Sequence, residues 1–372
     1  MDGLPMLTLR KLTASIFILV LALTIGYFFL NTHSGEPAIR PMNIIDPILA
    51  PIIDSFADEI DANTSNAKAR IELGMTYEGA SMNELAEATY KQYAIQFPDR
   101  VIGWYRLAVV QQKQGKIEEA IKSLLNAAEL AGPKMDSPHW QLAFWYIELG
   151  DFDNASKQTE LANSKKPNSM QVQIAKGRIA LAQGKPELAI DILNNNQLIA
   201  SIPDGYVYQL LGRAYRAAGD EEKSREAWSR AGQSKPNWAD PWTALVIEHV
   251  VGLNAMRQEI IKQMRARNLL VARKLIDDYF TYDKDNRVVR RLDAKCNSLN
   301  GKSAKAMKKY LVLITEDQSD VVTMVLLAKL RMQLKKFQTE EEMAITKEIL
   351  MEVIEISPDH GQAKILMESL PE

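Results

Sequence analysis

The chain repeats a helical pattern with a fixed period, and this period restricts its fold more than any other feature. Prolines that end helical stretches stand at Pro98, Pro167 and Pro236, at spacings that are multiples of about 34 residues. The stretches Leu73–Tyr77 and Leu211–Tyr215 recur at the same distance before a proline. A period of this length predicts a stack of antiparallel helical pairs, in which each pair packs on its neighbours and separate globular cores are unnecessary.

Each unit also repeats the residue sizes that a tight helical hairpin needs. A large and a small residue stand side by side in the first helix, so that the second helix can approach closely; the pairs are Leu73 and Gly74, Leu107 and Ala108, Leu142 and Ala143, and Leu211 and Gly212. The first helix is expected to stop at a left-handed glycine, at Gly115, Gly150, Gly184, Gly219 and Gly301. A bulky residue follows in the second helix, at Tyr90, Leu124, Leu193, Trp228 and Tyr310.

One unit matches a known repeat pattern almost residue by residue. Its matching positions are Tyr208, Leu211, Gly212, Tyr215, Ser224, Trp228, Ala231 and Pro236. With these residues the chain resembles the tetratricopeptide repeat family. The resemblance implies an all-α fold, a right-handed superhelical α-solenoid of helical hairpins.

The period also divides the chain into segments. We predict five regular repeats over 67–238, at 67–100, 101–135, 136–169, 170–204 and 205–238, then an irregular helical unit over 239–286, degenerate repeats at 287–320 and 321–360, and a capping helix over 361–372. Gly252 interrupts the irregular unit, and its helices lack the Leu-Gly pair.

The N-terminal segment is expected to anchor the chain in a membrane. Residues 12–32 form an uncharged run of about 21 residues, long enough to span a bilayer. The run ends in the bulky stretch Tyr27–Leu30 and not in a small-residue cleavage site, which favours an uncleaved signal anchor. Arg10 and Lys11 precede it and acidic residues follow it, so residues 1–11 are expected in the cytoplasm and the repeats across the membrane, in a bacterium in the periplasm.

Residues 33–66 are predicted to form a proline-rich tether that ends in a possible capping helix. Prolines stand at Pro37, Pro41, Pro47 and Pro51, which favours an extended chain. The segment also contains apolar residues that a free linker does not need, namely Ile44, Ile45, Ile48, Ile52, Ile53 and Phe56. They are expected either to dock on the first repeat or to lie at the bilayer surface.

The resemblance implies that the first helix of each repeat lines a concave, peptide-binding groove. Carried onto this chain, the groove residues are Ile71, Met75, Tyr105, Val109, Trp140, Phe144, Ile174, Arg178, Gln209, Arg213 and Arg216. This groove is apolar and aromatic at first and basic in the fifth repeat, which suits a peptide with large apolar anchors next to an acidic segment. In the alternative interpretation, Trp140 and Phe144 pack between neighbouring helices and the arginines form a solvated face.

A second candidate surface is the basic seventh unit. It carries Arg287, Arg290, Arg291, Lys295, Lys302, Lys305, Lys308 and Lys309. Such a surface is either a binding site for an acidic partner or lipid headgroups, or a solvated helix face.

The sequence indicates a binding protein and not an enzyme. The net charge of −2 gives no global affinity for nucleic acid. Its histidines are not spaced as metal ligands, and its single cysteine, Cys296, is interpreted as a small core residue. Neither a cofactor, nor a metal, nor a small-molecule substrate is expected.

These observations favour a membrane-anchored scaffold or assembly factor that binds a protein or peptide partner in its groove. One alternative is a periplasmic, chaperone-like factor that holds unfolded exported proteins, as in cytochrome c biogenesis. Another is a structural spacer or self-associating solenoid.

Overall fold

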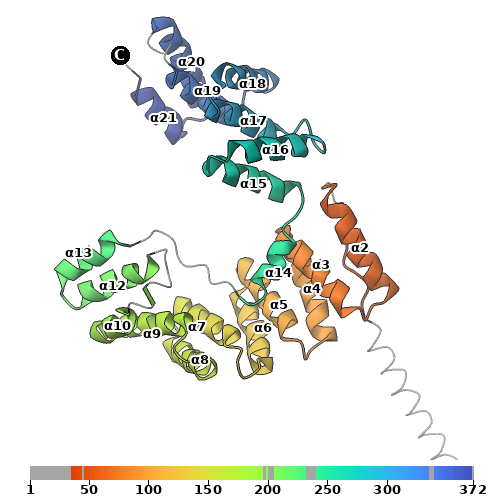
Figure 1. Cartoon of the computed structure of the whole chain (residues 1–372), viewed down its shortest axis with the longest axis vertical. Helices are drawn as coiled ribbons and strands as arrows, with labels where there is room; N and C mark the ends of the chain where they lie inside the picture. Colours follow the sequence, from red (N-terminus) through yellow and green to blue (C-terminus); the bar gives the residue numbers. More distant parts are fainter. Residues whose placement is uncertain are drawn as a thin grey trace, which may run out of the picture. The chain divides into compact units, whose positions relative to one another are not determined.

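A computed structural model describes residues 35–43, 46–195, 198–199, 205–231, 240–334 and 339–370. Every regular element within these residues is an α-helix, which confirms the all-α prediction (Figure 1). The chain divides into two compact units: unit 1 comprises Met1–Ile44 and Ala50–Val250, and unit 2 comprises Ile45–Leu49 and Val251–Glu372.

The expected anchor at 12–32 lies outside the described residues. None of the described helices is both long and apolar enough to span a bilayer.

Unit 1 is a succession of antiparallel helical pairs in which each helix packs on the next. The pairs are α3 with α4, α5 with α6, α7 with α8, α9 with α10, and α12 with α13. The helix bounds are α2 (Leu49–Ala62), α3 (Ala67–Gly79), α4 (Asn83–Gln96), α5 (Val101–Lys113), α6 (Ile117–Leu130), α7 (Ser137–Leu149), α8 (Phe152–Lys165), α9 (Met170–Ala182), α10 (Pro186–Leu193), α12 (Tyr206–Ala217), α13 (Glu221–Ser229) and α14 (Thr243–Glu248).

Unit 2 continues the helical pairs with a core of its own. Its helices are α15 (Leu253–Arg265), α16 (Leu269–Phe280), α17 (Arg287–Leu299), α18 (Ser303–Glu316), α19 (Val321–Met332), α20 (Glu340–Ile356) and α21 (Gly361–Glu368). Cys296 lies buried in the cluster that α15, α16 and α17 form, as predicted. The irregular segment 239–286 is divided between the units, because α14 packs on α3 in unit 1 whereas α15 and α16 belong to unit 2.

Close approach of paired helices occurs where the small residues predicted it. A Cβ atom added to Gly74 would lie 2.5 Å from the ring of Tyr90, and one added to Gly212 would lie 2.7 Å from the indole of Trp228. The bulky side chain of the second helix therefore packs against the backbone of the first helix, where only glycine leaves room.

The predicted turn glycines adopt the left-handed conformation. Gly115, Gly150, Gly184, Gly219 and Gly301 all have φ between 69° and 81°. Two turns without glycine reach the same region with Ser81 (φ 62°) and Arg267 (φ 61°). The geometry of the hairpin therefore requires this conformation even where the residue type disfavours it.

Residues 35–43 run as an extended segment that polar side chains hold in place. The Arg40 guanidinium forms ion pairs with Asp54, Asp58 and Asp61 of α2. The Tyr77 hydroxyl of α3 donates to the carbonyl oxygen of Ile39 at 2.6 Å. The segment thus connects α2 to the first repeat.

Arg70 of α3 fixes the beginning of this segment. Its side chain is fully buried and donates to the carbonyl oxygens of Glu36 and Thr64 and to the amide oxygen of Gln92. Burial lowers the pKa of Arg70, partly offset by the charge of Glu36. Because a buried guanidinium needs several acceptors, the position of the segment is coupled to the packing of α3 and α4.

The helix α2 has one buried apolar stripe. Ile53, Ala57 and Ile60 have no exposed surface, whereas Ile52 and Phe56 are partly exposed. Ile53, one of the apolar residues for which docking or a bilayer surface was expected, is therefore buried by the chain itself.

We predict that Gly74→Ala lowers the free energy of unfolding of the repeats. The added methyl group would displace the buried Tyr90 ring, and overpacking of this kind costs about 1–3 kcal/mol. The loss exceeds the gain in helix propensity of about 1 kcal/mol. Urea unfolding followed by circular dichroism measures the effect. Gly132→Ala is the control, because a Cβ there meets no atom within 4 Å, and an equal effect of both variants would contradict the prediction.

Candidate peptide-binding groove

Most of the predicted groove residues are buried in unit 1. Ile71, Met75, Tyr105, Trp140, Phe144 and Ile174 are at most 9% exposed. Val109, Arg178 and Gln209 are partly exposed, and Arg213 and Arg216 are exposed. The eleven residues therefore do not form one open surface.

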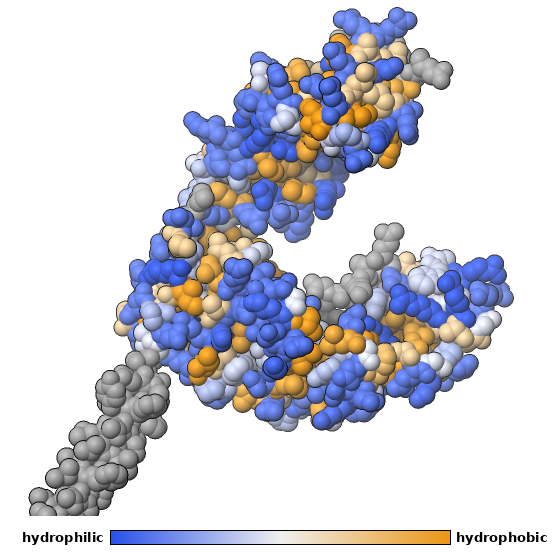
Figure 2. All heavy atoms as spheres, turned by 180° about the vertical axis from the view of Figure 1, so that it is seen from behind, coloured by the Kyte–Doolittle hydropathy of each residue, from blue (hydrophilic) through white to orange (hydrophobic). Residues whose placement is uncertain are grey.

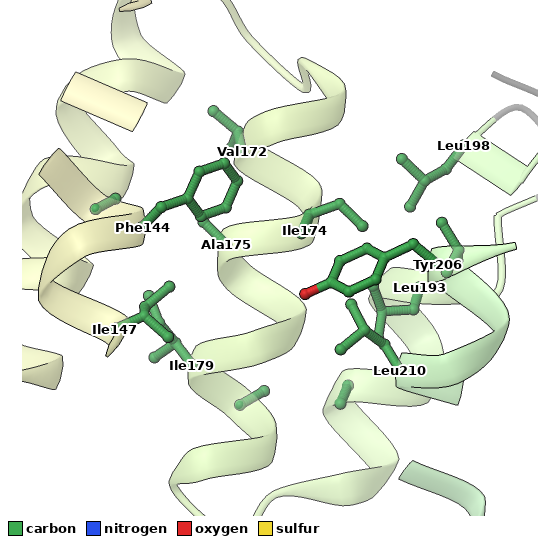
Figure 3. Close-up of a cluster of buried hydrophobic side chains, with 14 of the residues drawn as sticks. Phe144, Ile147, Val172, Ile174, Ala175, Ile179, Leu193, Leu198, Tyr206 and Leu210 are labelled. Atoms are coloured by element: carbon green, nitrogen blue, oxygen red, sulfur yellow. The ribbon is translucent and has the colours of Figure 1, made fainter. Parts of the chain in front are cut away.

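Trp140, Phe144 and Ile174 belong to the hydrophobic core between neighbouring repeats. Figure 3 shows Phe144 on the side of its helix that faces α9, in the same cluster as Ile174. The Trp140 and Phe144 rings meet edge to face, with their centroids 5.7 Å apart. This packing corresponds to the alternative interpretation of the two aromatic residues, because the first helix of a repeat must contact its neighbours as well as line a groove.

Arg178 contacts an aromatic ring and a carboxylate in this part of the predicted groove. Its guanidinium carbon lies 5.7 Å from the centroid of the Phe144 ring, and its Nη2 atom lies 2.6 Å from a carboxylate oxygen of Glu148. The predicted basic character of the groove is therefore partly neutralised at this position.

Residues 240–250 of the same chain cover the first helices of the first two repeats. The contact between Arg106 and Asp240 joins residues 134 positions apart in the sequence. The helix α14 within this segment packs on α3. We call residues 240–250 the internal segment.

The N-terminal end of the internal segment meets a buried charge network. The Glu78 carboxylate, which has no exposed surface, accepts hydrogen bonds from Arg106, Lys113 and the Tyr90 hydroxyl. The Arg106 Nη1 atom donates to Asp240 at 2.8 Å. The network therefore connects α3, α4, α5 and the internal segment.

Opposing effects set the protonation of this network. Burial acts to raise the pKa of Glu78, but the charges of Arg106 and Lys113 outweigh it and hold the pKa below its usual range. Burial likewise acts to lower the pKa of Arg106, and Glu78 and Asp240 outweigh it and raise the pKa. The carboxylate and the guanidinium are therefore both charged at neutral pH, so the loss of either partner would leave the other as an unpaired buried charge.

An aromatic contact lies beside the charge network. The rings of Tyr105 and Trp242 are tilted by 56° with their centroids 4.8 Å apart. The partly buried Trp242 packs on the cluster that contains Tyr105, Leu142 and Trp145, and partly buried Val109 packs on the same cluster. The Tyr105 hydroxyl has no hydrogen-bond partner among the described residues, and burial raises its pKa.

The C-terminal end of the internal segment lies on the last turns of α3. The His249 Nε2 atom is 2.6 Å from a carboxylate oxygen of Glu72, and its Nδ1 atom is 2.7 Å from the carbonyl oxygen of Leu245. A Cβ atom on Gly79 would lie 2.4 Å from the carbonyl oxygen of His249, so the absence of a side chain there permits the contact.

Sequence reasoning missed this contact. Asp240, Trp242 and His249 fall in the predicted irregular unit and occupy no position of the repeat pattern. The signal that was present is the absence of the Leu-Gly pair, together with an apolar stretch, Leu245–Ile247, too short for a repeat helix. These features indicate a segment outside the stack, but not where it docks.

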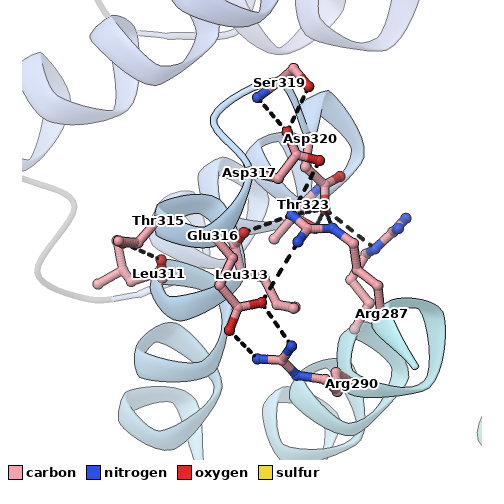
Figure 4. A network of polar contacts seen from close by, with 11 residues as sticks. Arg287, Arg290, Leu311, Leu313, Thr315, Glu316, Asp317, Ser319, Asp320 and Thr323 are labelled. Atoms are coloured by element: carbon pink, nitrogen blue, oxygen red, sulfur yellow. Dashed lines mark hydrogen bonds and ion pairs between the residues drawn. The ribbon is translucent and has the colours of Figure 1, made fainter. Parts of the chain in front are cut away.

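The predicted basic surface of unit 2 is partly neutralised by ion pairs. Figure 4 shows Arg290 facing Glu316, with both its terminal nitrogens hydrogen-bonded to the carboxylate, and Arg287 reaching Asp320. Lys309 likewise pairs with the buried Asp293. These cations connect neighbouring helices, so their first role is in packing.

Large hydrophobic side chains are also exposed elsewhere on the described residues. Figure 2 shows one face on which hydrophobic side chains reach the surface in small patches between hydrophilic ones. Exposed apolar residues such as Ile95, Leu149 and Ile247 come from different helices. In the same described part of the chain, no group of His, Cys, Asp and Glu side chains is arranged to hold a metal ion.

Comparison with protein families agrees with the hairpin geometry. A family model described as tetratricopeptide repeat matches residues 71–136, the segment that contains α3–α6. Residues 71–136 are therefore tetratricopeptide repeats. No curated protein sequence matches this repeat protein.

Solved structures that match parts of this chain include tetratricopeptide repeat proteins. YrrB, described as having an unusual peptide-binding site, is 16% identical with a TM-score of 0.41, over 48% of this chain and 91% of YrrB. A repeat protein from Parabacteroides merdae is 14% identical with a TM-score of 0.41, over 77% of this chain and 93% of that one. MamA is 18% identical with a TM-score of 0.39, over 44% and 88%.

We predict that protonation of Glu78 destabilises unit 1 in acid. Because the folded state lowers the pKa of Glu78 below its ordinary value near 4.5, its contribution to stability is complete above that pH and is lost as the pH falls further. Glu78→Gln is expected to be less stable at pH 7 by about 3–5 kcal/mol, because it leaves Arg106 without its buried partner.

The measurement is urea unfolding between pH 3 and pH 7. The stability of Glu78→Gln is expected to change less over this range than that of the natural chain, because glutamine binds no proton. Glu129→Gln, at an exposed position of α6, controls for the loss of one carboxylate. Parallel pH curves for the natural chain and Glu78→Gln would contradict the prediction.

Proposed function

We propose that this repeat protein is a membrane-anchored scaffold that holds a protein partner on the concave face of its repeats. The observation that carries the proposal is the internal segment, which side chains of α3 and α5 hold through an ion pair, an aromatic contact and backbone contacts. These first helices therefore have the chemistry to bind a short peptide that contains a helical turn.

Exposed arginines of the fifth repeat provide a second part of the proposed binding surface. Arg213 and Arg216 are exposed on α12, whereas Tyr206, Val207 and Leu210 of the same helix are buried. Exposed guanidinium groups suit carboxylates of a partner, because they form bidentate hydrogen bonds. A partner that reaches from the first to the fifth repeat would use both features.

We predict that a partner crosslinks to the first helix of the fifth repeat. The full chain carries a photoreactive benzophenone amino acid at Arg213, and irradiation of intact cells of its own host is expected to give a discrete protein adduct. The same group at Arg225, exposed on the second helix α13, is the matched control. Mass spectrometry of the adduct identifies the partner. If both positions give the same adducts, or neither gives one, the concave-face proposal fails.

We predict that residues 1–34 keep the chain on the membrane. The full chain is expected to stay with membranes after an alkaline carbonate wash, whereas a chain that begins at residue 35 is expected in the soluble fraction, because the apolar run at 12–32 supplies the affinity. Protease added to spheroplasts is expected to digest the repeats of the full chain. Release of the full chain by the wash would contradict the anchor, and protection from protease would contradict the orientation.

A further inference from the structure

We propose that the groove of the first two repeats recognises a partner segment in which an acidic residue precedes a tryptophan by two positions and a helical turn follows. We propose further that residues 240–250 occupy this groove within the chain until such a partner competes. The inference rests on the proposed function and names the chemistry of its ligand. The internal segment has this order in Asp240, Pro241 and Trp242, followed by α14.

The charge balance of the groove calls for an acidic ligand. Without the internal segment, two cations, Arg106 and Lys113, share a single carboxylate, that of Glu78. Asp240 supplies the second carboxylate at a side chain, that of Arg106, which is only 3% exposed. An acidic residue is therefore favoured at this position, because a neutral one leaves a buried positive charge without full compensation.

The fold of the repeats does not require Asp240. Arg106 donates to Glu78 through Nε and Nη2, and only Nη1 reaches Asp240. When the internal segment leaves, the pair that joins α3 to α5 therefore stays intact. The groove can exchange its occupant without unfolding.

Tyr105 determines which ligand side chain fits beside it. Its ring is fully buried when Trp242 lies against it, so an occupant without a large ring at this position would leave it exposed to water. Tyrosine and tryptophan rings in tilted contact stabilise an interface beyond the effect of their buried area. A tryptophan two residues after the acid therefore fits the site.

Burial is distributed unequally between the groove and its occupant. The receiving residues Tyr105 and Arg106 are at most 2% exposed. In contrast, α14 has no buried residue, and Leu245 and Ile247 on it are 42% and 63% exposed. A segment that leaves its own apolar side chains exposed is the occupant that a partner can displace.

The experiment supplies the internal segment as a separate peptide to a chain in which the contacts of its own segment are weakened. The full chain with Asp240→Ala and Trp242→Ala has a weakened internal segment and serves as the receptor. The probe is a fluorescein-labelled, N-acetylated peptide with the sequence of residues 240–251, and its binding is followed by fluorescence anisotropy. Circular dichroism checks that all variants are folded.

The receptor variant is expected to bind the peptide at least about tenfold more tightly than the natural chain, whose own segment competes at high effective concentration. A peptide with alanine in place of Asp240 and Trp242 is expected to lose binding. Adding Gly79→Val to the receptor variant is also expected to abolish binding, because the new side chain would meet the backbone at His249. This control leaves Arg106 and Tyr105 untouched.

Two results would overturn the inference. The first is equal binding, or none up to about 1 mM peptide, by the natural chain and the receptor variant. The second is exchange between copies, in which the natural chain forms dimers with the receptor variant but the free peptide does not bind. A crosslink at Arg213 that persists in either case would leave the proposed function standing, and its absence together with peptide binding would reject the wider function alone.

Discussion

The packing of a bulky side chain against the backbone of a partner helix determines how this chain is built. Tyr90 on Gly74, Leu193 on Gly177 and Trp228 on Gly212 each bring two helices so close that a Cβ atom would not fit. One hairpin leaves apolar surface on both sides, so it is stable only when the next hairpin covers it. In these three repeats the same contact therefore joins the two helices and creates the need for a neighbouring hairpin.

The buried carboxylate of Glu78 distinguishes the first two repeats from the other repeats of the stack. Packing alone would make the first two repeats interchangeable with the others, but Glu78 fixes the Arg106 guanidinium so that one nitrogen remains for a group outside the stack. The cost of burying the carboxylate is offset by three donors from α4 and α5. A structural ion pair thus orients the buried Arg106 guanidinium so that one of its nitrogens binds the internal segment.

The fold was predictable because its determinants are local. Gly150 and Gly219 mark turns, and Gly74 and Gly212 mark close contacts, at spacings that recur along the sequence. The groove was not predictable to the same extent. Trp140 and Phe144 stand on the stripe that the family uses for ligands, but contacts with the next repeat bury them, and the period does not distinguish the two uses of one helix.

The internal segment escaped prediction for a different reason. Asp240 meets Arg106 across 134 positions, and no repeat connects the two sites. A tryptophan such as Trp242 is often buried, whichever residues surround it, so its residue type does not indicate which residues it contacts. Only the three-dimensional course of the chain brings an acid and an indole onto the first two repeats.

The contacts of residues 36–40 determine how far the repeats stand from the proposed anchor. The Glu36 carbonyl is bound by buried Arg70 and the Ala38 amide by Asp61, so the chain is already part of unit 1 at residue 36. Only four residue steps separate this point from the end of the proposed anchor at residue 32, a reach of about 14 Å at full extension. The proline-containing segment therefore does not act as a long flexible linker. The first repeat would stay beside the lipid headgroups, where lateral diffusion in the membrane restricts its search for partners to two dimensions.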